Sequence, residues 1–147
     1  FMETPFVPTE ERSNRKFPLL LTTGRILSQY YVGAQTRRTA NVTWHTEDVL
    51  EIHEADAAMR GIVDGQKIAV SSRIGETILT ALVSDRVPAG VVHTTFHHPT
   101  SGANVVTTEY SDWATNCPEF KVTAVEIRPA DSSAAPTNTL ESVLTKA

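Results

Sequence analysis

The chain has 147 residues, of which 40% are hydrophobic and 20% are charged, and this length fits one domain that buries about 68–70% of its unfolded surface. Its net charge of −4 argues against a nucleic-acid surface, which is usually basic, and a small anionic ligand fits better than DNA. No apolar run approaches the roughly 18 residues that a membrane-spanning helix needs, so we expect a soluble protein without a membrane span.

The chain opens with a polar stretch that contains prolines. Residues 1–16 hold Pro5 and Pro8, and we predict that they are a linker from an upstream domain of a longer polypeptide. Short apolar runs bounded by turn signals follow, which is typical of many strands. We predict strands at residues 19–22, 49–52, 67–71, 77–84, 91–95 and 122–127. The run at 77–84 is apolar on both faces, as in a strand buried on both sides, and a closed barrel would explain this.

One helix is predicted between the strands, at residues 54–60. Its first turn carries Glu54 and Asp56 and its last turn carries Arg60, which complements the helix dipole. Gly61 follows at a position where a left-handed cap is favoured. After residue 129 the composition shifts to Asp, Ser, Ala, Pro and Thr. We therefore predict a flexible tail at 130–147 and a folded domain at 17–129.

Two stretches, far apart in the sequence, carry residue types that suit a ligand better than a core. Residues 19–39, LLLTTGRILSQYYVGAQTRRT, run from an apolar strand into a turn where Gly24 would let the backbone approach a ligand. Arg25 and the pair Arg37 and Arg38 supply planar donors suited to phosphate, and because Arg37 and Arg38 are neighbours they should point different ways. The second stretch, residues 94–121, is TTFHHPTSGANVVTTEYSDWATNCPEFK. This stretch is also dense in polar and aromatic residues that are unlikely to be core.

The adjacent residues His97 and His98 raise the possibility of a zinc site, which the sequence does not favour. Adjacent strand residues face opposite sides, and no partner His or Cys stands at a ligand spacing. We expect His45 and His53 at the surface or at strand ends. Cys117 is the only cysteine, which excludes a disulfide framework and suits a reducing compartment, and we expect it to pack rather than to bind metal. We therefore predict no metal ligand in this chain.

The order helix, Gly-Ile-Val-Asp-Gly, strand, Ser-Arg-Ile-Gly, strand, Pro-Ala-Gly, strand resembles the carboxy-terminal domain of the molybdopterin-dinucleotide oxidoreductases, the dimethyl sulfoxide reductase superfamily. The segments LTTGRILSQYYVGAQTRRT, TTFHHPTSGANVVTT and SDWATNCPEFKVTAV are similar to the alpha, catalytic subunit of NAD-dependent, molybdenum-containing formate dehydrogenases. The resemblance covers about residues 17–127. It implies a mainly β fold with short helices, namely a six-stranded double-psi β-barrel of the aspartate decarboxylase-like type.

The resemblance also implies a cofactor. In this family the subunit holds molybdenum or tungsten between two molybdopterin guanine dinucleotides, and the barrel closes over them. The chain would bind this bis-molybdopterin guanine dinucleotide for the oxidation of formate to carbon dioxide. It would not be catalytic in isolation, because the metal ligand and the iron–sulfur clusters would belong to upstream domains. The cofactor-binding residues carried over by motif are Thr23, Gly24, Arg25, Gln29, Tyr31, Phe96, His97, Asn104, Phe120 and Lys121. Phe120 stands where the family commonly has Tyr, so a phenolic hydroxyl is missing.

The implied partners are the upstream domains of the same subunit and flavin- and iron–sulfur-containing subunits that reduce NAD, in the cytoplasm. One alternative is the same domain of another molybdopterin oxidoreductase, such as a nitrate reductase, and the upstream metal ligand would decide between them. A second alternative is a free-standing double-psi barrel that binds protein partners. Such a module would not need the TGR, FHHP and NCPEFK motifs together.

Overall fold

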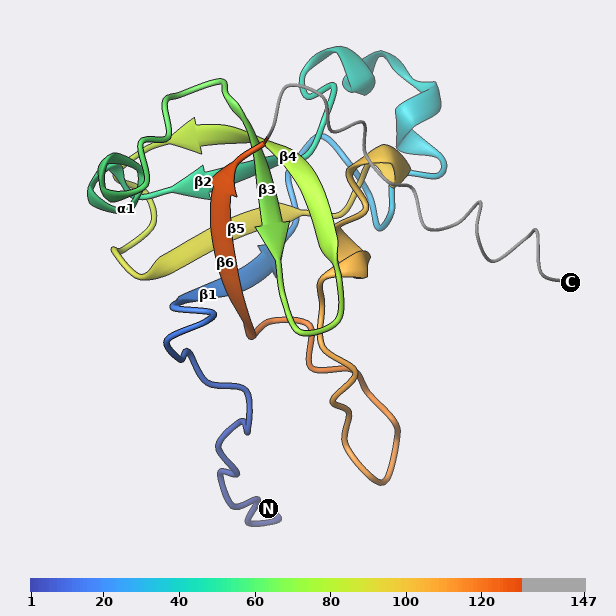
Figure 1. The fold of residues 1–147 in the computed structure, drawn as a ribbon. Helices are drawn as coiled ribbons and strands as arrows, with labels where there is room; N and C mark the ends of the chain where they lie inside the picture. Colours follow the sequence, from blue (N-terminus) through green and yellow to red (C-terminus); the bar gives the residue numbers. More distant parts are fainter. Residues whose placement is uncertain (131–147) are drawn as a thin grey trace, which may run out of the picture.

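Six strands close into a barrel in the computed structural model, which describes residues 1–130 (Figure 1). The strands are β1 (Leu19–Gly24), β2 (Val49–Ile52), β3 (Lys67–Ser71), β4 (Glu76–Val83), β5 (Val91–Thr95) and β6 (Thr123–Pro129). All six predicted strands are present, and those at 49–52, 67–71 and 91–95 are confirmed at both ends. Around the barrel the order is β1-β5-β2-β4-β3-β6.

The strand directions explain where the long loops lie. Strands β1 and β5 are parallel, as are β2 and β4, and the other neighbouring pairs are antiparallel. Two parallel pairs within a closed six-stranded barrel confirm the predicted double-psi fold. This pairing brings the ends of β1, β3 and β5 and the starts of β2, β4 and β6 to one end of the barrel. We call it the loop end, because the long segments 25–48 and 96–122 connect strands there.

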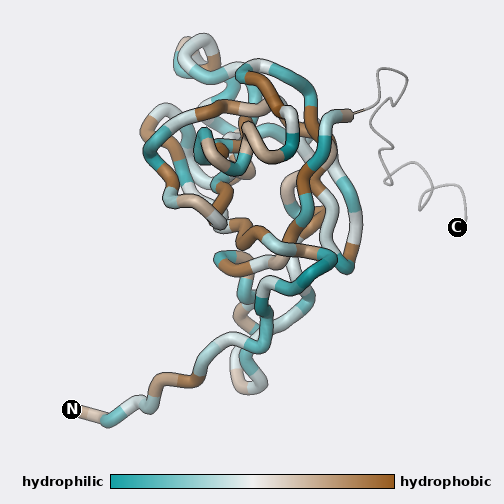
Figure 2. Tube along the Cα trace, turned by 60° about the vertical axis from the view of Figure 1, so that its left-hand side comes forward, coloured by the Kyte–Doolittle hydropathy of each residue, from teal (hydrophilic) through white to brown (hydrophobic). Residues whose placement is uncertain are grey.

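The barrel encloses a core of aliphatic side chains. Figure 2 shows hydrophobic residues recurring along the strands, between more polar ones. The largest fully buried side chains from the strands are Leu19, Leu21, Leu50, Ile52, Ile68, Val70, Val92, Val125 and Ile127. Each such burial stabilises the fold by about 1.5–3 kcal/mol relative to an exposed side chain.

The prediction that residues 77–84 are buried on both faces is wrong. In β4 only Leu79 and Ala81 are fully buried, whereas Ile78 and Thr80 are half-buried. The physical reason is that the inner face of a barrel strand packs in the core while its outer face is only partly covered. The apolar residues on the outer face therefore did not indicate a second buried side.

The helix α1 (Glu54–Met59) lies at the opposite end of the barrel from the long loops (Figure 1). The N–H of Ala55 donates to Nδ1 of His53, which caps the helix at 3.2 Å, and Gly61 follows with φ +63°. These features confirm the predicted helix and its left-handed cap, although Arg60 is the cap residue rather than part of the last turn. No helix within residues 1–130 is long and apolar enough to cross a membrane.

The amino-terminal segment contacts the barrel from Thr9 onward. The Thr9 hydroxyl donates to the Glu119 carboxylate at 2.8 Å. The Glu11 side chain is buried, accepts a hydrogen bond from the N–H of Ala124 at 2.8 Å and forms an ion pair with Arg73. The boundary at residue 17 stays a prediction, and the predicted tail lies outside the described residues except for its first position.

Candidate ligand-binding site

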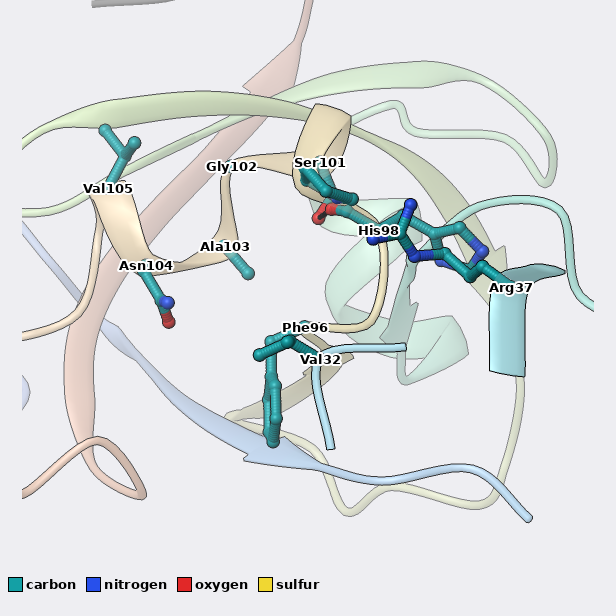
Figure 3. A pocket seen from close by; sticks show the side chains of 10 residues that line it. Val32, Arg37, Phe96, His98, Ser101, Gly102, Ala103, Asn104 and Val105 are labelled. Carbon is teal, nitrogen blue, oxygen red and sulfur yellow. Dashed lines mark hydrogen bonds between the residues drawn. The ribbon is translucent and has the colours of Figure 1, made fainter. Parts of the chain in front are cut away.

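Two pockets lie at the loop end, between the segment that follows β1 and the segment that follows β5. The first has a volume of about 390 Å³, and its wall includes Arg37, His98, Ala103 and Val105 (Figure 3). The second has a volume of about 360 Å³, and its wall includes Thr23, Thr107, Thr108, Pro118 and Phe120. Both pockets are also lined by Val32, Phe96 and Asn104. They are therefore two parts of one groove, which we call the histidine pocket and the threonine pocket.

The parallel pairing of β1 with β5 brings the two walls of the groove together. Gly24 at the end of β1 lies opposite Thr95 at the end of β5, so the two polar stretches leave the barrel side by side. A Cβ atom on Gly24 would collide with the imidazole of His93. The glycine therefore avoids a collision with a side chain of the neighbouring strand, a reason that the sequence did not reveal.

His97 fixes the path of the chain after β1. The ring is fully buried, and its Nε2 atom accepts a hydrogen bond from the N–H of Ile26 at 3.1 Å. Because Nε2 is the acceptor, Nδ1 carries the proton and donates it to the carbonyl oxygen of Tyr31. Both ring nitrogens are thus occupied by backbone groups of the loop, and in this structure His97 positions the loop rather than lining the groove.

Asp48, the residue before β2, holds together the wall that is formed by the segment after β5. Its buried carboxylate accepts hydrogen bonds from the N–H of His97 at 3.1 Å, the N–H of His98 at 2.8 Å and the Ser101 hydroxyl at 2.7 Å, and also from the Thr95 hydroxyl. Nδ1 of His98 lies 3.2 Å from the same carboxylate. Burial by itself would raise the pKa of Asp48, but hydrogen bonds from Thr95, Ser101 and His98 outweigh it and lower the pKa below its ordinary value. Asp48 is therefore an ionised acceptor.

Arg37 reaches the histidine pocket over a glycine. Gly33 has φ +73°, and a Cβ atom on it would lie 2.8 Å from the carbonyl oxygen of His97 and 2.9 Å from Nε of Arg37. Only glycine leaves room for the arginine to lie this close to the loop. Arg38 is exposed and lies outside both pocket walls. The two adjacent arginines thus point different ways, as predicted.

A pair of hydrogen bonds joins two parts of the wall of the threonine pocket. The buried hydroxyl of Thr23 donates to the carbonyl oxygen of Phe120 at 2.9 Å, and Nζ of Lys121 donates to the carbonyl oxygen of Thr23 at 2.6 Å. The last residues of β1 are thereby joined to the segment that leads into β6. Phe120 stays about one-third exposed, at 36%, and its side chain forms part of the pocket wall.

The structure sorts the ten residues predicted to bind a cofactor into two sets. Thr23, Phe96, Asn104 and Phe120 line the groove. The other six do not form its wall: Gly24, Arg25, Gln29, Tyr31, His97 and Lys121. Among these, Arg25 and Tyr31 are exposed at the same end, with the guanidinium 5.0 Å from the ring centroid. Contact with a cofactor remains a prediction for both sets.

Sequence reasoning missed three residues of this site. His98 was considered only as a zinc ligand, and Asp48 and Thr108 were not singled out. One signal could have indicated Asp48, because the donor-rich run TTFHHPTS needs a buried acceptor and an acidic residue stands just before a strand. Thr108 resembles its polar neighbours in the sequence, so only its burial distinguishes it.

Unpartnered polar atoms mark the groove as a place for a ligand. Within residues 1–130, five buried side-chain atoms have no hydrogen-bond partner: Gln29 Nε2, Arg37 Nε, His98 Nε2, Thr108 Oγ1 and Thr123 Oγ1. Arg37 and His98 line the histidine pocket, and Thr108 lines the threonine pocket. Buried polar groups in native proteins nearly always have partners, so the three residues in the groove have polar atoms to offer a ligand, whereas Gln29 and Thr123 lie outside both pocket walls. An arginine, an imidazole and a hydroxyl suit phosphate oxygens and the edges of heterocyclic rings.

The other candidates for metal ligands lie apart. Within the described part of the chain, no three His, Cys, Asp or Glu side chains are grouped so that they could hold a metal ion. As predicted, His45 is exposed and His53 stands at a strand end, directly after β2; the structure adds that His53 caps α1. Cys117 is exposed, so the expectation that it packs is wrong; it lies in the loop 112–117, which Asp112 braces by accepting hydrogen bonds from backbone N–H groups.

Curated relatives match most of the chain. The alpha subunit of F420-dependent formate dehydrogenase 1 from Methanococcus maripaludis is 35% identical over 123 residues, which is 83% of this chain and 18% of that protein. The alpha subunit of F420-dependent formate dehydrogenase from Methanocaldococcus jannaschii is 36% identical over 118 residues, or 80% of this chain and 18% of that protein. The chain thus spans less than one-fifth of the length of these relatives.

A solved structure and a family pattern also match. Acetylene hydratase from Pelobacter acetylenicus superposes with a TM-score of 0.65 at 15% identity, over 78% of this chain and 18% of that one, which supports the fold alone. The family described as "Molydopterin dinucleotide binding domain" matches residues 19–124, from the start of β1 into β6 and across both walls of the groove. The chain therefore belongs to the family of molydopterin dinucleotide binding domains.

Proposed function

We propose that the groove at the loop end binds a molybdopterin dinucleotide and that the chain is the cofactor-binding domain of a larger formate dehydrogenase subunit. The observation that carries this proposal is the set of unpartnered buried atoms on Arg37, His98 and Thr108, which line one groove in a domain of this family. The relatives named as formate dehydrogenase alpha subunits support formate as the substrate of the complete enzyme.

The residues of the groove suit different parts of such a ligand. Val32 and Phe96 stand at the junction of the two pockets and offer apolar surface to a flat ring. Arg37 supplies positive charge for a phosphate, and Asn104 offers a donor and an acceptor to a heterocyclic edge. When bound, the dinucleotide with its metal supplies the redox chemistry. The chain binds and orients the dinucleotide and shields it from water.

The finer identity of the cofactor follows the resemblance. We propose bis-molybdopterin guanine dinucleotide with molybdenum or tungsten, and we place the metal ligand and the iron–sulfur clusters in the rest of the subunit. The remaining motif residues are proposed to complete the contacts when the other domains are present, namely Gly24, Arg25, Gln29, Tyr31 and Lys121, with His97 contributing through the loop that it positions. We propose that the enzyme is cytoplasmic. Flavin- and iron–sulfur-containing subunits that reduce NAD are proposed partners. The relatives' names introduce F420 as a second electron acceptor to be tested beside NAD.

Blocking the groove in the complete subunit tests this proposal. Asn104 is exposed and borders both pockets, so Asn104→Trp should fill the groove without disturbing the core. Ala89→Trp, in the turn before β5 at the opposite end of the barrel, is the matched control. Pterin and metal per subunit should fall for Asn104→Trp and stay at the wild-type level for Ala89→Trp. Purified wild-type subunit without a pterin dinucleotide, or an Asn104→Trp variant with the full amount, would refute the proposal.

A further inference from the structure

Two residues that line the histidine pocket, His98 and Arg37, each have a buried nitrogen atom without a hydrogen-bond partner within residues 1–130. His98 is buried, with only 7% of its surface exposed, yet its Nε2 atom has no hydrogen-bond partner among residues 1–130. Arg37 is only partly buried, but its Nε atom is buried and also lacks a partner in the described part of the chain, and both residues line the same pocket. In Figure 3 the two side chains stand together on one side of the pocket. A ligand in this pocket would therefore lie beside both side chains.

Asp48 fixes the orientation of the His98 side chain. Its backbone N–H donates to the Asp48 carboxylate at 2.8 Å, and Nδ1 lies 3.2 Å from the same carboxylate. Since the ionised carboxylate can only accept, Nδ1 must be the donor. Nε2 is then an acceptor in the neutral ring and a donor in the charged ring. This nitrogen is free to serve the ligand, because the other one is already engaged with Asp48.

We propose that His98 and Arg37 are ligand-binding residues of the histidine pocket, that they hold a polar group of the dinucleotide, and that Asp48 is the positioning residue that orients His98. This inference rests on the proposed function. It goes beyond it by assigning the binding to two residues and a buried carboxylate that lie outside the motif-derived contacts. The pocket wall beside them is apolar, through Val32, Phe96 and Ala103. Hydrogen bonds made there are shielded from water.

Two substitutions remove the unpartnered nitrogen atoms and keep the other contacts of each side chain. In His98→Asn an amide nitrogen replaces Nδ1 and can still donate to Asp48, but no atom replaces Nε2. In Arg37→Lys the positive charge stays but the Nε–H donor is lost. Matched controls are His45→Asn and Arg38→Lys, because both residues are exposed and lie outside the pocket walls.

The experiment follows the dinucleotide in the complete subunit. After purification, pterin is measured by the fluorescence of its oxidised form and metal by mass spectrometry, and release into buffer is timed. His98→Asn and Arg37→Lys should each release the cofactor about tenfold faster than wild type, which corresponds to one lost hydrogen bond of about 1.4 kcal/mol. The controls should release it at the wild-type rate. Wild-type release from either pocket variant would overturn its assigned contact.

The proposed positioning role of Asp48 needs a measurement that a purely structural role would not affect. Asp48→Asn should speed release in the wild-type background, but it should add almost nothing in the His98→Asn background, since its effect on the ligand passes through His98. Thr95→Val removes another hydrogen bond to Asp48 without touching His98 and should leave release unchanged. Independent, additive effects of Asp48→Asn and His98→Asn would refute the positioning role, and if Asp48→Asn does not fold, faster release from Thr95→Val would refute it. Wild-type subunit without any cofactor would instead refute the proposed function.

Discussion

The imidazole of His97 holds the backbone of Ile26 in place: Nε2 accepts the amide N–H at 3.1 Å, across the boundary between the two walls of the groove. The same ring donates to the carbonyl oxygen of Tyr31. A single buried side chain thus determines where the segment after β1 leaves the barrel. The loop can present Val32 and Arg37 to the groove because its start is anchored in this way.

His97→Ala should therefore destabilise the chain. The substitution leaves an N–H and a C=O without partners and opens a cavity, so we expect the free energy of unfolding to fall by about 2–4 kcal/mol. Urea denaturation followed by circular dichroism measures this. The fully exposed Leu27 in the same loop is the control, and Leu27→Ala should change stability by less than about 0.5 kcal/mol. Equal stability of the two variants would contradict the anchoring role.

Gly24→Ala should be destabilising even in the absence of any ligand. Its new methyl group would collide with the ring of His93, and such overpacking costs about 1–3 kcal/mol. If the collision is the cause, His93→Ala should remove most of this penalty when the two substitutions are combined. Thermal unfolding of the two single variants and the double variant measures the coupling. Additive effects would mean that the glycine is needed for another reason.

His93 should make stability depend on pH. Burial lowers the pKa of His93 below its ordinary value of 6.5, Glu51 opposes this, and Arg86 and Lys121 reinforce it. The unfolded chain then binds a proton at a higher pH than the folded chain does. The stabilisation is therefore complete above pH 6.5 and is lost as the pH falls from there through the folded-state pKa.

The matched variant for this pH effect is His93→Gln. Between about pH 7.5 and about pH 5.5 the wild type should lose more unfolding free energy than His93→Gln does. Urea denaturation at each pH provides the measurement. Parallel loss in both proteins would show that other groups cause the pH dependence.

Truncation at the amino terminus should locate the functional start of the domain. A chain that begins at Thr9 keeps the Glu11 carboxylate, which accepts from Ala124 and pairs with Arg73, and it should unfold like the full chain. A chain that begins at Phe17 leaves a buried N–H without an acceptor and should be less stable by about 1–3 kcal/mol. The midpoint of thermal unfolding checks both. Equal midpoints for the two truncated chains would support the boundary at residue 17 as predicted from the sequence.

Among the three strands that were predicted correctly at both ends, two follow a turn that contains a glycine with positive φ. Gly65 and Gly90 have positive φ values just before β3 and β5, so the sequence indicated where those strands start. Strand β1 is longer than predicted, because Thr23 and Gly24 pair with Thr94 and Thr95 although they are not apolar. Polar strand residues whose pairing partner lies some 70 positions away cannot be identified by hydrophobic patterning.

Residues of the groove could be predicted from the sequence only where they belong to a motif of the family. Phe96 and Asn104 came from the resemblance and do line the groove. The role of Asp48 depends on the antiparallel pairing of β2 with β5, which brings its carboxylate beside Thr95 and His98. Thr108 has an unpartnered hydroxyl only because the surrounding loop buries it. Both facts arise from barrel closure, which the local sequence does not encode by itself.

The separation of core and groove has a consequence for how such domains diversify. Most aliphatic residues of the core cluster lie on the strands, and Val106 is its one member from the segments 25–48 and 96–122, which form most of the groove. Insertions or exchanges in these two segments can therefore change the ligand preference while the scaffold continues to fold. Grafting both segments together from one relative to another should transfer binding as a unit, whereas grafting one alone would break the His97 anchor between them.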